Sequence, residues 1–188
     1  FQGLYTYRSV PSQAGAGIIC LQELDVGRER SGFRDQAGEI AKRLEVDYEF
    51  HPAWHLEGEQ FGNAILSRYP MRVVKATGLH HHKEDRSRRS ALWVEIEIDP
   101  QTTIQLISTH LSIYPKEQLI QAKQLIEEWV QPASSLGPVI LCGDFNAFPN
   151  SATYRVFASE LFDVESFDQN PTRSTLFSPF PISRVDHI

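Results

Sequence analysis

The apolar run at residues 138–142, Pro-Val-Ile-Leu-Cys, is the feature that most constrains the fold of this chain. It shows no polar alternation, so it predicts a strand that is buried on both of its faces. Asp144 and Asn146 follow the run directly. A carboxylate at the mouth of such a strand is costly to bury alone. The chain is therefore expected to form layers around an interior sheet, with these two polar side chains at one end of it.

The segment Gly143-Asp144-Phe145-Asn146 also has two plainer interpretations. An Asp after Gly at a strand end often caps a turn or the next helix. An Asp-x-Asn sequence also opens a calcium loop, but here the sixth position is Pro149 instead of Gly and the twelfth is Arg155 instead of Glu. The calcium loop is excluded, and the capping interpretation has to be weighed against the other strand ends.

Three further apolar segments carry polar side chains, at residues 17–23, 103–111 and 184–188. If the ends of these strands lie together, they form an acidic pocket with one histidine. Hard carboxylate oxygens suit Mg²⁺ or Mn²⁺, and there are too few His and Cys residues there for zinc. Such a pocket supports attack of water on a phosphate. Its expected members are Glu23, His110, Asp144, Asn146 and Asp186.

Alternating and helical patterns predict the elements around this pocket. We expect short strands at 17–23 and 48–51, and consecutive antiparallel strands over 61–111, with 61–67 and 71–79 as a hairpin. Apolar spacing predicts helices over 36–44, 115–130 and 151–159. We therefore predict one domain over 1–188 of the α/β (α+β) class, a four-layer α/β sandwich of two packed mixed β-sheets flanked by helices.

Composition narrows the classes of partner. The formal net charge of −6 argues against a large basic face for non-specific nucleic-acid binding, although a local basic cleft is compatible with it. Cys20 and Cys142 lie in apolar runs and are expected to be buried free thiols. No segment approaches the ~20 apolar residues of a membrane span, and no secretory segment is visible. We expect a cytoplasmic monomer without a transmembrane segment.

The ordered set of motifs resembles the endonuclease/exonuclease/phosphatase superfamily, which includes pancreatic-type deoxyribonucleases, apurinic-site endonucleases, neutral sphingomyelinases and inositol-polyphosphate 5-phosphatases. Each motif alone is weak evidence, but together they follow the order of the family from about residue 15 to the end. The matching motifs are Leu21-Gln22-Glu23, the segment 62–68, Arg89 ahead of Ala91-Leu92, Ser108-Thr109-His110-Leu111, Gly143-Asp144-Phe145-Asn146 and the segment 184–188.

The resemblance implies a hydrolase that uses Mg²⁺ or Mn²⁺ to direct water at a phosphodiester or a phosphomonoester. Glu23 is implied to be the metal ligand, and His110 is implied to contact the scissile phosphate. Asp144 is implied to orient or deprotonate the attacking water, and Asn146 to stabilise the pentavalent phosphorus. The resemblance further implies that Asp186 holds a second catalytic histidine.

Two further residues are implied to bind substrate: Arg89 near the phosphate or bracing the site, and Asn63 lining it. The substrate class stays open among DNA, RNA, phospholipid head groups and inositol phosphates, so nucleic acid is one candidate partner.

The sequence departs from the family pattern at both ends. The stretch 4–8 lacks the Asn that the family places on its first strand, and the chain ends at Ile188, before a Ser-Asp-His motif. We therefore hypothesise that the C-terminal strand and part of the N-terminal strand are missing. His187 follows Asp186 directly, so we expect it to point to the opposite face of its strand.

Several residues that could suggest a metal or substrate site are expected to have ordinary structural roles. The run His80-His81-His82 is expected to be a solvated loop, because consecutive residues of an extended chain alternate in direction. Arg86 and Arg88 are either solvated or in contact with an anionic substrate. His51, Trp54 and His55 are expected in a loop of aromatic character, which could pack on the surface or stack on a base or a sugar.

Two other functions remain open on the sequence. One is a degenerate, non-catalytic binding module on the same scaffold, as the two missing motifs would allow. The other is a glycosidase that uses the carboxylate pair of Glu23 and Asp144, a chemistry that requires neither His110 nor Asn146.

Overall fold

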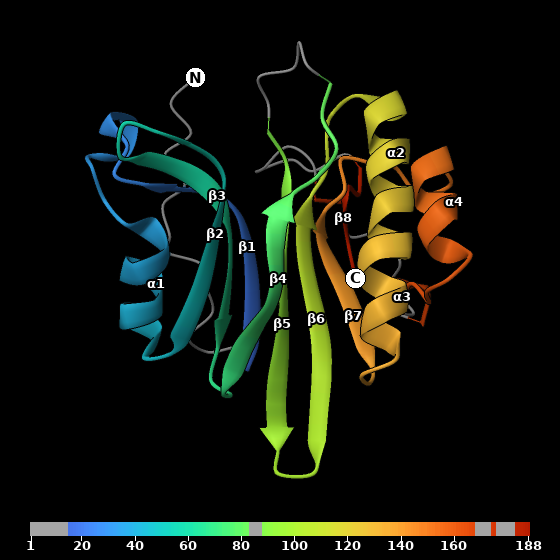
Figure 1. Ribbon diagram of the computed structural model, residues 1–188, viewed down its shortest axis with the longest axis horizontal. Helices are drawn as coiled ribbons and strands as arrows, with labels where there is room; N and C mark the ends of the chain where they lie inside the picture. The colour runs from blue at the N-terminus through green and yellow to red at the C-terminus, as the bar shows by residue number, and fades with distance from the viewer. Residues whose placement is uncertain (1–14, 83–87, 168–173, 176–182) are drawn as a thin grey trace.

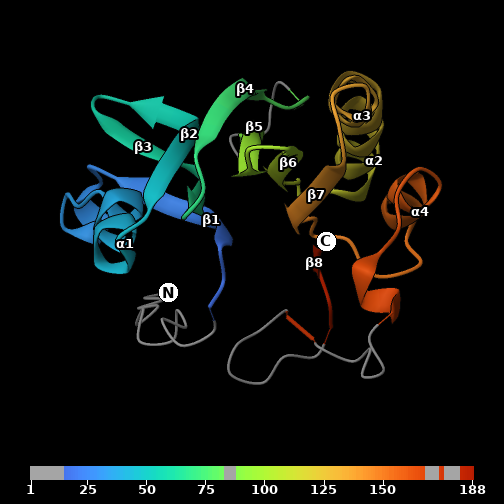
Figure 2. The same ribbon diagram turned by 90° about the horizontal axis from the view of Figure 1, so that it is seen from below.

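Two β-sheets face each other in the middle of the molecule (Figure 1, Figure 2). The computed structural model describes residues 15–82, 88–167, 174–175 and 183–188. The first sheet has the strand order β1-β3-β2 and the second the order β4-β5-β6-β7-β8. The pair β6 and β7 is parallel and all other pairs are antiparallel. The strands are β1 (Ile18–Val26), β2 (Asp47–Leu56), β3 (Glu59–Ser67), β4 (Met71–Gly78), β5 (Ser90–Asp99), β6 (Thr102–His110), β7 (Val139–Asp144) and β8 (Asp186–His187).

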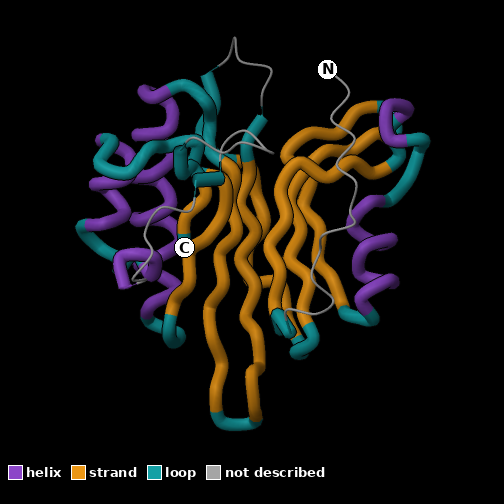
Figure 3. The backbone as a smooth tube through the Cα atoms, turned by 180° about the vertical axis from the view of Figure 1, so that it is seen from behind, coloured by secondary structure: helices purple, strands orange, loops and turns teal. Residues whose placement is uncertain are grey.

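Helices cover the outer face of each sheet, which completes the predicted four-layer sandwich (Figure 3). The first sheet packs against α1 (Gln36–Leu44), and the second sheet packs against the helices that follow β6 in the chain. Three apolar clusters fill the spaces between the layers, one under each set of helices and one between the sheets. The remaining helices are α2 (Pro115–Leu125), a π-turn (Ile126–Val130), α3 (Gln131–Ser134) and α4 (Ala152–Ala158), with short 3₁₀ turns at Glu29–Ser31 and Val164–Phe167.

The alternating pattern of β5 is confirmed. Leu92, Val94 and Ile96 are buried between the two sheets, because they lie on the face of β5 that meets the first sheet. Trp93 points to the helices instead, and its indole N–H donates to Gln105 Oε1 at 2.8 Å. Both faces of β5 are therefore covered, which is why it tolerates a large aromatic residue among aliphatic ones.

The predicted helix over 115–130 is confirmed, and it continues to Ser134 through the π-turn. Pro132 lacks an N–H group, so the carbonyl of Glu128, four residues earlier, receives no regular helical hydrogen bond. Lys75 Nζ lies 3.2 Å from that carbonyl and supplies a donor from β4. The widened turn lets the helix pass the proline and keep Trp129 fully buried.

One strand prediction was wrong, and another was confirmed in position but too short. Segments 61–67 and 71–79 do not form a hairpin, because β3 and β4 belong to different sheets and 68–70 carries the chain from one sheet to the other. The crossing is fixed by Ser67, whose hydroxyl accepts from the Tyr69 N–H and donates to the Tyr69 carbonyl, both at 2.9 Å. The short strand at 48–51 extends to Leu56, since a bulge accommodates Pro52.

No helix in the described residues is long and apolar enough to cross a membrane. The segment 4–8 and Arg86, which entered the sequence predictions, lie outside the described residues.

Candidate active site

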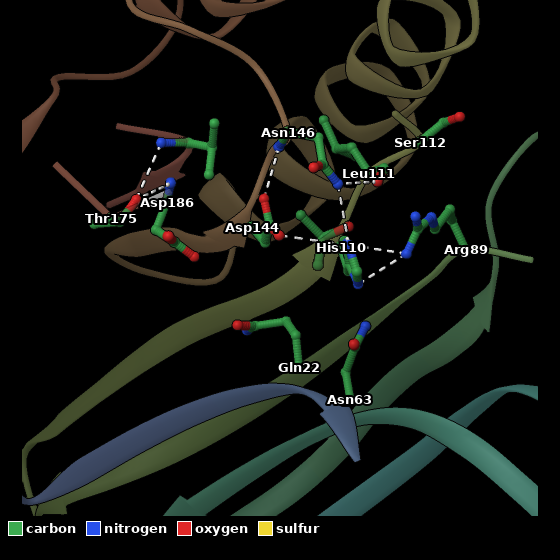
Figure 4. Close-up of polar contacts among 12 residues, drawn as sticks. Gln22, Asn63, Arg89, His110, Leu111, Ser112, Asp144, Asn146, Thr175 and Asp186 are labelled. Carbon is green, nitrogen blue, oxygen red and sulfur yellow. Dashed lines mark hydrogen bonds and ion pairs between the residues drawn. The ribbon is translucent and has the colours of Figure 1, made fainter. Parts of the chain in front are cut away.

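Three neighbouring strand ends bring His110, Asp144 and Asp186 into one row (Figure 4). His110 is paired with Asp144 across β6 and β7, and Asp144 is paired with Asp186 across β7 and β8. Residues directly opposite each other on adjacent strands project from the same face of the sheet. The parallel pairing of β6 and β7 therefore places the predicted histidine and carboxylates together.

Gly143 explains why the row can form at this point. It lies opposite Thr109 with φ 141°, and a Cβ atom there would overlap the Thr109 carbonyl. Only glycine tolerates this close approach of backbone to backbone at such a φ. The Gly before Asp144 is thus required by the packing of β7 against β6.

Asn146 folds back over the row in a left-handed conformation, with φ 49°. Its backbone N–H donates to Asp144 Oδ1 at 2.8 Å, and its side-chain Nδ2 donates to the Leu111 carbonyl at 2.9 Å (Figure 4). Because that carbonyl can only accept, the amide nitrogen is the atom that also lies 3.1 Å from His110 Nε2. Asn146 therefore links the Asp144 carboxylate to the His110 ring.

Arg89 lies against the same imidazole. Its Nη1 is 2.9 Å from Nδ1 and 2.8 Å from Nε2 of His110, and both residues are buried. Burial, and then the positive charge of Arg89, lower the pKa of His110 to about 3. The imidazole is therefore neutral at physiological pH, and its 3.5 Å contact with Asp144 Oδ2 is not an ion pair.

Asp144 has the opposite electrostatic character. Burial raises the pKa of its carboxyl to about 6, an effect that the Asn146 N–H partly offsets and that the negative charges of Asp186 and Glu23 increase. A carboxylate with this pKa can accept a proton near neutral pH. The mutual repulsion of these carboxylates also makes the site favourable for a cation.

Glu23 and Asn63 approach the row from the facing sheet. The register places Leu21 opposite Ala64 and Leu24 opposite Gly62, so that two residues of β1, Gln22 and Glu23, oppose Asn63 alone on β3. This bulge changes the direction of side chains relative to a regular strand. The members of the bulge reach across the sheets: Gln22 Nε2 lies 3.4 Å from Ser108 Oγ, and Asn63 Nδ2 donates to the Ser90 carbonyl at 3.1 Å.

Glu23 has φ 61° and is exposed. Within the described part of the chain it makes no hydrogen bond or ion pair, and its charge acts on Asp144 and Arg30. Its carboxylate is thus free to take a ligand at the same edge as Asp144.

The donor set at this edge is compatible with a hard divalent ion held by few protein ligands. No three His, Cys, Asp or Glu side chains among the described residues lie close enough to share an ion. Mg²⁺ is commonly bound through one or two carboxylates with waters and substrate phosphates as its other ligands. Glu23, supported by the acidic surroundings of Asp144, fits that mode of binding.

The structure thus brings His110, Asn146 and Arg89 into contact around Asp144, with Asp186 beside it and Glu23 and Asn63 on the facing sheet. The prediction for His187 is confirmed: its ring is buried on the other face, with Nε2 2.8 Å from the Ala147 carbonyl. The hydroxyl of Thr175 accepts from the Asp186 N–H at 3.2 Å, a contact that no sequence pattern indicated.

The aromatic segment near the site was assigned wrongly. His51, Trp54 and His55 belong to β2 instead of a loop, and the Arg28 guanidinium lies 5.2 Å from the centre of the Trp54 ring. No sequence pattern indicated the buried Asp25, whose carboxylate accepts two hydrogen bonds of 2.7 Å from Arg30. This ion pair fixes the end of β1 just beyond the bulge.

The histidine run is tied to α2 through its backbone. The His80 N–H donates to Gln124 Oε1 at 2.9 Å, and the His82 N–H donates to Glu117 Oε1 at 2.7 Å. The His81 ring contacts Arg88, with 2.6 Å between Nε2 and Nη1. The three rings are not part of a metal cluster among the described residues.

Comparisons with known proteins show which proteins this chain is similar to. Residues 7–188 match the Endonuclease/Exonuclease/phosphatase family. The chain is 27% identical over 198 residues to the uncharacterized protein YbhP of Escherichia coli strain K12, covering 96% of this chain and 74% of that protein.

Two solved structures show the same fold. The human Nocturnin catalytic domain with bound sulfate has a TM-score of 0.66 at 19% identity, over 91% of this chain and 67% of that one. A mannosyl-6-phosphatase of Bacteroides thetaiotaomicron has a TM-score of 0.66 at 18% identity, over 91% and 69% of the two chains. With the matched residues spanning both sheets and every strand end of the site, the chain belongs to the endonuclease/exonuclease/phosphatase family.

Proposed function

We propose that this protein is a divalent-metal-dependent phosphoesterase that hydrolyses a phosphate ester by in-line attack of water. Members of its family act on phosphate esters. The observation that carries the proposal is the arrangement of Asp144, with a raised pKa, beside a neutral His110 and the folded-back amide of Asn146. A glycosidase needs only the pair of carboxylates, so it leaves the contacts of His110 with Asn146 and Arg89 without a purpose.

Each side chain has a role that its surroundings favour. Asp144 orients the attacking water and accepts its proton, since its pKa of about 6 lies close to neutral pH. Asn146 and His110 bind the oxygens of the phosphate, and Arg89 contributes a buried positive charge that stabilises charge developing on them. Asn63 lines the site from the facing sheet.

A bound Mg²⁺ or Mn²⁺ would be held by Glu23 and would supply positive charge at the phosphate oxygens. The chain's own residues prepare that place through the bulge of β1, which directs Glu23 away from the regular ladder. Asp186 contributes further negative charge beside Asp144.

The experiment that tests the proposal measures hydrolysis of p-nitrophenyl phosphate and bis-p-nitrophenyl phosphate with Mg²⁺ or Mn²⁺, with and without chelator. We expect turnover that chelator abolishes and that Asp144→Asn lowers by at least about a hundredfold, in line with loss of a positioned general base. The ratio of the two substrates distinguishes a monoesterase from a diesterase. Hydrolysis of a panel of nucleic acids, sphingomyelin, inositol phosphates and mannose 6-phosphate then identifies the class of the natural substrate.

A matched control is Asp99→Asn, which removes a carboxylate from the exposed β5–β6 turn at the far end of the sheet. It should hydrolyse both substrates at the wild-type rate. Turnover that persists in chelator, or an Asp144→Asn variant as active as wild type, would contradict the proposal. Metal binding without turnover of any substrate would favour the non-catalytic binding module instead.

A further inference from the structure

We propose that Cys20 and Cys142 are an oxidation-sensitive pair that joins the two sheets through a reversible disulfide directly beneath the site. The chain has two cysteines in all, and neither takes part in the proposed hydrolysis. Both are free thiols, one on β1 and one on β7, in opposite sheets.

The register of the strands places the two thiols opposite each other. Cys142 lies beside Ser108 in the β6–β7 pairing, and Gln22 of β1 reaches the hydroxyl of Ser108 across the sheets. Residues two apart on a strand project from the same face, so Cys20 points the same way as Gln22. Both cysteines accordingly lie in the apolar cluster between the sheets, where the nearby Cys20 thiol, and then burial, raise the pKa of Cys142.

Burial decides which thiol meets an oxidant first. Cys20 is partly exposed, whereas Cys142 is only 6% exposed. With hydrogen peroxide, the Cys20 sulfur attacks one peroxide oxygen and the O–O bond breaks, which gives a sulfenic acid and one water. The Cys142 sulfur then attacks the Cys20 sulfur, the S–O bond breaks, and a second water leaves with the thiol proton. The pair of thiols is oxidised by two electrons and the peroxide is reduced.

The crosslink has a mechanical consequence for the site. Cα atoms of β1 and β7 approach to within 8 Å of each other, and the Cα atoms of a disulfide are about 4.4–6.8 Å apart. Oxidation therefore fixes the spacing of β1 and β7 at the value that the disulfide geometry sets. Glu23 follows Cys20 by three residues and Asp144 follows Cys142 by two, so the fixed spacing acts on both carboxylates. This consequence for turnover rests on the proposed function, but the crosslink itself does not.

The test treats the full chain with a small molar excess of hydrogen peroxide, under conditions where dithiothreitol can be added back. The intact mass should fall by about 2 Da as two thiol hydrogens are lost. Both thiols should disappear from titration in denaturant, and a tryptic digest should contain one peptide pair that joins Cys20 to Cys142. Hydrolysis should fall at least about fivefold and return on reduction.

The variants Cys20→Ser and Cys142→Ser are the controls. Each keeps one thiol and replaces the other by a hydroxyl of similar size, so neither variant should lose 2 Da or lose activity by crosslinking. A wild-type mass that instead rises by added oxygen, or a disulfide between two chains on a non-reducing gel, overturns the proposal. If the crosslinked protein hydrolyses substrate as fast as the dithiothreitol-treated protein, the coupling between the crosslink and the site is overturned. Absence of hydrolysis in reduced protein counts against the proposed function alone, because the crosslink is measured by mass.

Discussion

The surroundings of Asp144 oppose its negative charge more than those of the other site residues do. Its proposed role nevertheless requires the charged carboxylate. It is partly buried, and it faces the negative charges of Asp186 and Glu23. His110 is held in the opposite way, since burial and Arg89 keep its imidazole neutral. The two neighbours therefore differ in protonation: Asp144 changes its protonation state near neutral pH, whereas His110 stays neutral and keeps its hydrogen-bonding role.

The first prediction concerns the pH dependence of hydrolysis. In the proposed mechanism the active form of Asp144 is the carboxylate, so activity should rise with pH and reach half its maximum near pH 6 at low metal concentration. More metal should shift that midpoint down, because a nearby cation favours the carboxylate. Initial rates from pH 4.5 to 8.5 at two Mn²⁺ concentrations measure this. A rate that declines as pH rises through 6 would count against Asp144 as the proton acceptor.

The second prediction concerns stability without metal. The folded pKa of Asp144, about 6, lies above its ordinary value of 3.8, so the folded state binds more protons between these values. Stability is thus lost as pH rises through this window. Asp144→Asn should raise the free energy of unfolding by about 1–2 kcal/mol at pH 7.5, allowing for partial exposure of the carboxyl, and by almost nothing at pH 4. Urea unfolding at both pH values measures the difference.

The control for this measurement is Asp99→Asn, because the exposed Asp99 carboxyl should give the same unfolding midpoint as wild type at either pH. If Asp144→Asn is less stable than wild type at pH 7.5, the carboxylate is stabilised in the fold and the raised pKa is wrong.

The members of the site could be predicted from sequence because a polar residue at the end of an apolar strand is conspicuous. Their contacts could not. The approach of Arg89 to His110 and the return of Asn146 to the same ring depend on strand pairing between segments far apart in the chain. The roles that the family resemblance implies for these residues, including that of Asp186, stay predictions.

Among the strands, β3 is the one on which the position of Glu23 depends. Its neighbours bulge on either side of Gly62, β1 at Gln22 and Glu23 and β2 between Pro52 and Trp54. A Cβ at Gly62 would overlap the His51 carbonyl and lie 2.7 Å from Pro52 Cα. Glycine at this position lets β2 approach closely, next to the bulge of β1 that carries Glu23.

The third prediction follows from this contact. Gly62→Ala should lower the free energy of unfolding by about 2 kcal/mol, the usual cost of forcing an extra carbon into a packed interior. Gly78→Ala is the matched control, since the nearest atom to its added Cβ is the Arg89 carbonyl oxygen at 3.7 Å, an ordinary contact. Its unfolding free energy should stay within about 0.5 kcal/mol of wild type. Equal effects of the two substitutions in urea unfolding would refute the role of Gly62.

Element types and most of their positions could be predicted, as the periodicities of β5, α1 and α2 show. The sheet to which a strand belongs could not, because β3 and β4 are separated by three residues that could equally form a hairpin turn. The bulge of β1 could not be predicted either. A strand of nine residues is too short for a change of register to be recognised in its pattern of polar and apolar residues.

At the scale of the whole molecule, the four layers were predicted because buried strands need cover on both faces. Glu23 and Asp144 lie on opposite sheets, so an ion bound at this edge would connect the two halves of the sandwich. Binding of metal should therefore stabilise the folded molecule as a unit.

The fourth prediction tests this linkage. Mn²⁺ at about a hundred times its dissociation constant adds about 2.7 kcal/mol of stability, which for a domain of this size raises Tm by roughly 5–10 °C. Glu23→Gln should remove most of the shift, while Glu97→Gln, on exposed β5 surface, should keep it. Differential scanning calorimetry with and without Mn²⁺ measures both. A full shift in Glu23→Gln would exclude Glu23 as the metal ligand.

The long hairpin of β5 and β6 extends beyond the rest of the sandwich, and its turn lies at the end opposite His110 (Figure 1). Exposed turns of this kind tolerate inserted residues well. A fluorophore or an affinity tag placed between Pro100 and Gln101 would report on the molecule, or tether it to a surface, while leaving the mouth of the site open to substrates of any size.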